Sequence, residues 1–300
     1  MAIIYKKYEQ VARKLYPDAI LLQVEPLAGG VSADVLRLDL RLKTGELRSI
    51  VMREHGPSHS GHSTSLEYQL LEALFRQGLP VPQPLCEDAS CELTDNPFVL
   101  LSYVPGVSGL PNRASNSYLD TAAEMLALIH GSSRKNLPEL PDRLDPLPEI
   151  FEYLPGEDDR QSLIEFLRNQ SNTTYQGTSR LLHGDFWPQN IIWNEGTIAA
   201  VLDWEDAAIG DPLSDLACSR IEIRYQFGVH GMQRFTEAYQ CRRFIDRRRL
   251  ALWQIYVSAA AQHFMGKWGL PNEREAIMRL ETKASIDEAS STLMSGEELI

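Results

Sequence analysis

The chain has 300 residues, of which 43% are hydrophobic and 23% charged, as is typical of a folded globular protein large enough for two lobes. Its net charge of −12 argues against a nucleic-acid partner, because a polyanion would be repelled by most of this surface. No apolar stretch is long enough to cross a membrane, and the first residues show no secretory signal, so we expect a cytoplasmic protein without a membrane partner.

The four cysteines are Cys86, Cys91, Cys218 and Cys241, and no two of them have the CxxC spacing typical of a zinc site. We interpret them as small apolar residues in a reducing compartment. A disulfide between Cys86 and Cys91 is an alternative that has no positive support in the sequence.

The first hundred residues are predicted to be rich in β-structure, with one long internal helix. Hydrophobic spacing predicts helices at 4–16 and 65–77 and strands near 21–27, 33–40, 47–53, 84–88 and 97–103. Thr44 and Gly45 indicate a hairpin between the second and third strands. Thr64 and Glu67 have the spacing of a capping box at the start of the internal helix.

The remainder of the chain is predicted to be mostly helical. Helices are expected at 115–131, 158–169, 212–225, 231–241, 246–266 and 272–289, with short β-type runs at 180–182, 191–193 and 198–202. Four prolines in 136–148 indicate a loop, and the tail after Ser290 is expected to be loosely held. This pattern predicts an α+β fold with an N-terminal lobe at 1–102, a connection at 103–107 and a C-terminal lobe at 108–300.

The most informative segment runs from His183 to Asp203. Asp185 and Asn190 bracket a tight loop that contains a proline, and an apolar strand then ends at Asp203. Phosphoryl transfer needs a carboxylate that accepts the proton of the attacking hydroxyl, and oxygen ligands that hold a divalent cation. A hairpin through Asn194-Glu195-Gly196 would bring Asp203 beside Asn190, so we expect the three side chains to converge.

The runs HGDFWPQNIIW and VLDWEDAAIGDPLSDLA resemble the aminoglycoside phosphotransferase and choline kinase family, whose members have a protein-kinase-like fold and phosphorylate small molecules. The resemblance implies that Asp185 is the catalytic base and that Asn190 and Asp203 bind Mg²⁺. It also implies that His183 supports the loop through hydrogen bonds. Asp211 and Asp215 of the GDPxxD run are expected to anchor the loop and the following helix.

The same resemblance assigns the nucleotide side of the site to the first lobe. The turn with Gly29, Gly30 and Ser32 is expected to approach the phosphates, and Arg53 on the third strand is expected to grip them. Glu67 would then pair with Arg53, although the capping box alone also explains its position. Adenine would bond to the backbone near Ser102 and Tyr103. ATP or GTP is the expected phosphoryl donor.

The acceptor is expected to be a hydroxyl of a neutral or cationic small molecule. Glu205 and Asp206 could face such a cation, or could lie in a solvated loop. Trp187, Trp204 and the helical region from Trp253 to Trp268 could line its pocket. His55, His59 and His62 are interpreted as part of a mobile loop, with a metal cluster as the alternative.

Other functions are weighed against this kinase. A nucleotide-binding pseudokinase or regulatory protein of the same fold is the alternative, and the presence of all three chemical residues argues against it. No G-x-S-x-G motif of hydrolases and no phosphate-binding P-loop motif is present. The sequence does not determine the oligomeric state.

Overall fold

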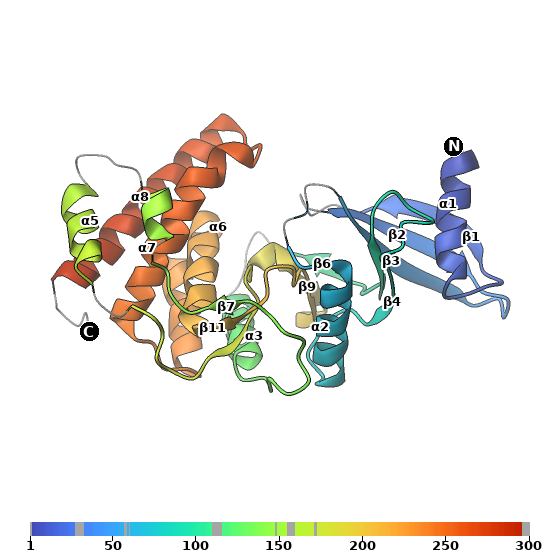
Figure 1. Ribbon diagram of the computed structural model, residues 1–300, viewed down its shortest axis with the longest axis horizontal. Helices are drawn as coiled ribbons and strands as arrows, with labels where there is room; N and C mark the ends of the chain where they lie inside the picture. Colours follow the sequence, from blue (N-terminus) through green and yellow to red (C-terminus); the bar gives the residue numbers. More distant parts are fainter. Residues whose placement is uncertain are drawn as a thin grey trace. The chain divides into compact units, whose positions relative to one another are not determined.

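The chain, seen in a computed structural model, folds into two compact units (Figure 1). The structure describes residues 2–27, 33–56, 59, 61–109, 116–147, 149–154, 160–170 and 173–295. The first unit comprises 1–109, 135–139 and 189–206, and the second comprises 110–134, 140–188 and 207–300. The segment 189–206 therefore packs with the β-rich first unit, whereas the sequence placed it in the C-terminal lobe.

The first unit is built on a five-stranded antiparallel sheet with the strand order β1-β2-β3-β5-β4. Its elements are α1 (Ala2–Arg13), β1 (Ile20–Pro26), β2 (Ala33–Arg41), β3 (Leu47–His55), α2 (Thr64–Arg76), β4 (Pro84–Asp88) and β5 (Phe98–Ser102). Each agrees with a predicted element to within a few residues. A second sheet in this unit has the order β10-β9-β6, from β6 (Val107–Ser108), β9 (Ile191–Asn194) and β10 (Thr197–Val201).

The two faces of β3 have different tasks, because successive side chains of a strand point to opposite faces. Ile50 and Met52 are fully buried in the core that packs against α1. Arg53 and His55 alternate with these residues and lie on the other face, where they meet α2. The alternation of β3 thus separates the core from a line of basic side chains.

The second unit is mostly helical and contains a small sheet with the order β7-β11-β8. Its elements are α3 (Asn116–Ile129), β7 (Asp142–Arg143), α4 (Ile150–Tyr153), α5 (Gln161–Arg168), β8 (Arg180–Leu182), β11 (Ala208–Gly210), α6 (Pro212–Gln240), α7 (Arg247–Phe264) and α8 (Asn272–Met294). Helices α6, α7 and α8 pack together in sequence order (Figure 1). A core of leucine, isoleucine and alanine side chains joins α4, α5, α7 and α8.

Helix α6 contains a kink where the sequence predicted two separate helices. Gly228 has φ of 68° and ψ of −173°, a backbone conformation that residues with a side chain rarely adopt. At the end of the chain, α8 continues to Met294 and buries Ser290 and Leu293, so the expectation of a loose tail directly after Ser290 was wrong. The short strands β6, β7 and β11 and the helix α4 were not predicted.

Two local predictions are corrected or settled by the structure. The cap of α2 is Ser63, whose hydroxyl accepts the main-chain N–H of Leu66 at 3.3 Å, and not Thr64. Glu67 contacts Arg53 and His55 instead, so it forms no capping box.

All four cysteines are free, which excludes the Cys86–Cys91 disulfide from this structure. No helix among the described residues is long and apolar enough to span a bilayer.

Candidate functional site

The first unit contains a buried cluster of charged side chains centred on Arg53. Arg53 is 7% exposed, and Nη1 of its guanidinium donates to Glu67 Oε1 at 2.6 Å. Nη2 donates to Asp203 Oδ1 at 2.7 Å and also to Glu205. The predicted pairing of Arg53 with Glu67 is therefore present, and the contacts with Asp203 and Glu205 bring together residues far apart in the sequence.

The charged groups of this cluster shift the pKa values of one another. Burial alone would lower the pKa of Arg53, but the three carboxylates outweigh it and raise that pKa above its usual value. Burial would raise the pKa of Glu67, and the bonds with His55 and Arg53 reverse this and hold the pKa below its usual range. Both groups are therefore charged at neutral pH, and breaking their buried pair would leave an uncompensated charge.

His55 and His59 extend this cluster, and the sequence had placed them in a mobile loop. His55 is the last residue of β3, is buried, and lies 2.7 Å from Glu67 Oε2. His59 stacks on His55 with ring centroids 4.0 Å apart, and its Nδ1 lies 3.5 Å from Glu205. Among the residues that the structure describes, no group of three or more His, Cys, Asp or Glu side chains is arranged to hold a metal.

The hairpin of β9 and β10 positions the two predicted metal ligands. Thr197 pairs with Asn194 and Val201 with Ile191, and the N–H of Leu202 donates to Asn190 O at 2.7 Å. This confirms that the hairpin returns Asp203 to the vicinity of Asn190. Asp203 has φ of 62°, which is uncommon for a residue other than glycine and is often found at functional sites.

The donors at this end of the hairpin suit a hard divalent cation. Asn190 supplies an amide oxygen and Asp203 a carboxylate, and Mg²⁺ prefers oxygen ligands of both kinds. Around Arg53, the three carboxylates exceed the single guanidinium by two negative charges, which one divalent cation would balance. By the chemistry of the donors and by charge, the residues present therefore fit Mg²⁺.

The remaining nucleotide-side residues are placed as follows. Ser102 ends β5, and its N–H donates to Gln83 O at 2.9 Å, so that N–H is already used. The ring of Tyr103 lies beneath the Arg37 guanidinium at 4.6 Å. Gly29, Gly30 and Ser32 lie outside the described residues.

The loop that carries Asp185 belongs to the second unit and is held by Asp215 of α6. Asp215 is fully buried and accepts the main-chain N–H groups of His183, at 2.6 Å, and Gly184, at 3.0 Å. The N–H of Asp185 donates to His183 Nδ1 at 3.2 Å, and Ser219 Oγ donates to Phe186 O at 2.7 Å. Four consecutive residues are thus fixed by side chains.

Asp215 is itself oriented by two residues that the sequence analysis missed. His130 Nε2 lies 3.1 Å from Asp215 Oδ2, and His130 Nδ1 lies 2.7 Å from the Tyr239 hydroxyl. Burial would raise the pKa of Asp215, but the bond and the charge of His130 outweigh it and lower that pKa. An ionised Asp215 only accepts, so Nε2 of His130 carries a proton toward it.

Further along α6, two side chains are influenced by the charge of Asp185. The Cys218 thiol lies 4.0 Å from Asp185 Oδ1, and burial and that carboxylate raise the pKa of the thiol. Glu222 is half-buried, and burial together with the charge of Asp185 raises its pKa to about 8. Residues 215, 218, 219 and 222 recur at helical spacing, so one face of α6 serves the Asp185 loop.

Several acceptor-side expectations were wrong. Trp253 is buried and its indole donates to Asp211 at 2.6 Å, and Trp204 is buried and donates to Val201 O at 3.1 Å. Both are core residues. Glu205 is a partner of Arg53, and Asp206 is exposed. Asp211 caps α6 by accepting the N–H of Leu213, as the sequence predicted.

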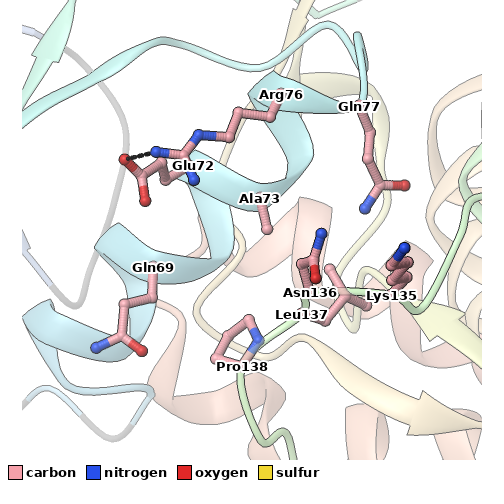
Figure 2. A pocket seen from close by; sticks show the side chains of 9 residues that line it. All are labelled: Gln69, Glu72, Ala73, Arg76, Gln77, Lys135, Asn136, Leu137 and Pro138. Carbon is pink, nitrogen blue, oxygen red and sulfur yellow. Dashed lines mark hydrogen bonds and ion pairs between the residues drawn. The ribbon is translucent and has the colours of Figure 1, made fainter.

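A cavity of about 460 Å³ lies elsewhere in the first unit (Figure 2). It is formed by side chains of α2 and by the segment 135–138. Its lining residues are Gln69, Glu72, Ala73, Arg76, Gln77, Lys135, Asn136, Leu137 and Pro138. None of the predicted site residues lines it.

Comparison with known proteins decides the family. The model of the phosphotransferase enzyme family matches residues 23–253, which include both the Arg53 cluster and the Asp185 loop. The chain belongs to the phosphotransferase enzyme family. The aminoglycoside 3'-phosphotransferase of Streptomyces fradiae is 25% identical over 225 residues, covering 66% of this chain and 80% of that protein.

Other relatives of this phosphotransferase-family chain are larger proteins. Acyl-CoA dehydrogenase family member 11 of Gallus gallus is 29% identical over 214 residues, which cover 58% of the chain but 25% of the relative. The member 10 protein of Mus musculus is 29% identical over 182 residues, covering 53% of the chain and 17% of the relative. The chain thus corresponds to a quarter or less of the length of these curated relatives.

Solved structures confirm the protein-kinase-like fold. The macrolide 2'-phosphotransferase of Brachybacterium faecium superposes with a TM-score of 0.61 at 19% identity, covering 97% of this chain and 98% of that one. A thermostable aminoglycoside phosphotransferase, bound to AMP-PNP and hygromycin B, superposes with a TM-score of 0.62 at 16% identity, covering 93% and 97%. At these identities the likeness establishes the fold alone.

Proposed function

We propose that the chain transfers the γ-phosphoryl group of ATP or GTP to a hydroxyl group of a small molecule, in a reaction that requires Mg²⁺. The observation that carries this proposal is the contact of Arg53 Nη2 with Asp203 Oδ1 at 2.7 Å. It joins a cation suited to phosphate oxygens with the carboxylate that is expected to hold the metal. The family supplies the reaction class, because its members are phosphotransferases.

In this proposal Asp185 orients the acceptor hydroxyl and takes its proton. The hydroxyl oxygen then forms a bond to the γ-phosphorus, while the bond from that phosphorus to the oxygen bridging to the β-phosphate breaks. The four side-chain contacts that hold residues 183–186 would keep the Asp185 carboxylate in one place, which matters because positioning supplies much of the rate in such reactions.

Asn190 and Asp203 would hold Mg²⁺, which when bound offsets the negative charge of the phosphates. Arg53 would bind phosphate oxygens, with Glu67 and His55 fixing its orientation. Because the Ser102 N–H is already bonded to Gln83 O, we assign the proposed adenine contact to the backbone of Tyr103. We also propose that residues 103–107 form the connection between the two lobes, and that the protein acts in the cytoplasm.

The acceptor is proposed to be a neutral or cationic alcohol, because the net charge of −12 disfavours an anionic one. An acceptor screen tests the reaction class. Candidate alcohols, including aminoglycosides and macrolides, are incubated with ATP or GTP and Mg²⁺, and release of the nucleoside diphosphate is measured. We expect release that depends on both the acceptor and Mg²⁺. Nucleotide binding without turnover on any acceptor would favour the pseudokinase alternative.

The metal assignment has a separate test by binding. We expect that Mg²⁺ and ATP no longer raise the melting temperature of Asp203→Ala, because this variant lacks the carboxylate ligand. The exposed neighbour provides a matched control, Asp206→Asn, which should keep that stabilisation. An unchanged thermal shift in Asp203→Ala would contradict the assignment of Asp203.

A further inference from the structure

Glu205 has no role in the proposed reaction, yet it contacts Arg53 in the buried cluster. Its carboxylate accepts from Arg53 Nη2, the same nitrogen that donates to Asp203. A guanidinium Nη atom carries two hydrogens, so these two carboxylates use both of them. A phosphate oxygen can therefore accept a hydrogen bond from Nη2 only after one of the two carboxylates has released it.

The segment that follows β3 holds the main chain of Glu205 in place. The N–H of His62 donates to Glu205 O at 3.0 Å. A Cβ added to Gly61 would lie 2.6 Å from Glu205 Cβ and 2.9 Å from Glu205 O, so only glycine allows this approach. The backbone is thus fixed, whereas the carboxylate lies between two partners, Arg53 and the imidazole of His59 at 3.5 Å.

The charges indicate what this arrangement does. Glu67, Asp203 and Glu205 surround one guanidinium, so without a cation the cluster repels a polyphosphate even though Arg53 attracts it. Glu67 is 1% exposed and lies on the Nη1 side, and Asp203 is the proposed metal ligand. Glu205 is the remaining carboxylate, and it shares Arg53 Nη2 with Asp203.

We propose that Glu205 is an internal counter-ion that holds the phosphate position on Arg53 and makes nucleotide binding depend on the divalent cation. Without the cation, Glu205 competes with the nucleotide phosphate for Nη2 and adds to the repulsion. With the cation bound, the excess negative charge is balanced, Glu205 leaves Arg53, and the phosphate takes its place. Glu205 is thus a positioning residue. This inference rests on the proposed function, because it takes Arg53 to bind phosphate.

The test compares ATP affinity with and without Mg²⁺ in wild-type protein, in Glu205→Gln and in Asp206→Asn. The amide keeps the shape of Glu205 and removes its charge, and Asp206→Asn removes an exposed charge one residue further on. We expect Glu205→Gln to bind Mg²⁺-free ATP about tenfold or more tightly than wild-type protein, since one negative charge beside the phosphate is removed. Affinity in the presence of Mg²⁺ should change little, and Asp206→Asn should behave as wild type.

The possible outcomes separate this inference from the proposed function. Equal Mg²⁺ dependence of ATP binding in wild-type protein and in Glu205→Gln would overturn the role of Glu205 alone. A loss of Mg²⁺-supported binding in Glu205→Gln would also overturn it, since Glu205 would then be a metal ligand. Absence of nucleotide binding by wild-type protein under both conditions would overturn the proposed function and this inference together. Glu205→Ala provides the same comparison should the amide variant not fold.

Discussion

Asp215 Oδ2 accepts the main-chain N–H of His183 at 2.6 Å, although the two residues are 32 positions apart. A carboxylate on α6 thereby fixes the start of the loop that carries Asp185. Because Asp215 is fully buried and accepts a second main-chain N–H from Gly184, its loss would leave several donors without a partner.

The first prediction concerns this anchor. Asp215→Asn places an amide NH₂ against the main-chain donors of His183 or Gly184, and should reduce the free energy of unfolding by about 3 kcal/mol. If the loop shifts, kcat should fall by about a hundredfold. Denaturant unfolding and steady-state kinetics measure the two effects. Asp120→Asn, which removes a surface ion pair with Arg234, should change stability by less than about 1 kcal/mol.

The second prediction concerns the pair of Arg53 and Glu67. Glu67→Gln removes the negative charge that balances the buried guanidinium, and its single carbonyl oxygen cannot serve both Arg53 and His55, so stability should fall by about 3 kcal/mol. ATP affinity should fall with it because Arg53 is no longer oriented. Glu72→Gln is the matched control, since Glu72 lies beside the cavity on the same helix and pairs with exposed Arg76 (Figure 2). Equal effects of the two changes would contradict the role of Glu67.

The pH dependence of stability provides the third prediction, through Glu222. Its pKa is raised from 4.5 to about 8 because it is buried near the charge of Asp185. The folded state therefore binds more protons than the unfolded state between these values, and stability falls as pH rises from 4.5 to 8. Glu222→Gln should flatten this decline and gain about 2 kcal/mol relative to wild type at pH 9. Parallel pH profiles of unfolding free energy in the two proteins would refute the raised pKa.

The secondary structure was largely predictable, because it depends on local patterns. Alternation of apolar residues located β3, and the Asn194-Glu195-Gly196 turn correctly placed Asp203 near Asn190. Local patterns left Glu67 with two interpretations, a capping box and a partner of Arg53. Its spacing from Thr64 is that of a capping box, but in the structure its carboxylate oxygens contact Arg53 and His55 instead.

The contacts that complete the candidate site could not be predicted from local patterns. Arg53 and Glu205 are 152 positions apart, and His130 and Asp215 are 85 apart. No periodicity links such residues, since their proximity depends on how whole elements pack. A buried histidine directly after α3, such as His130, carries no signal that distinguishes it from an ordinary core residue. Trp204 and Trp253 were expected to line an acceptor pocket but are core residues. An indole ring suits either setting, so the residue type alone could not distinguish them.

The measurement that tests the central claim most directly is the turnover of Asp185→Asn on an acceptor found by the screen, measured together with its affinity for Mg²⁺ and ATP. If Asp185 is the base of a phosphotransferase, the variant should bind nucleotide as tightly as wild type while kcat falls by about a thousandfold. Turnover by Asp185→Asn close to that of the wild-type protein would contradict this account.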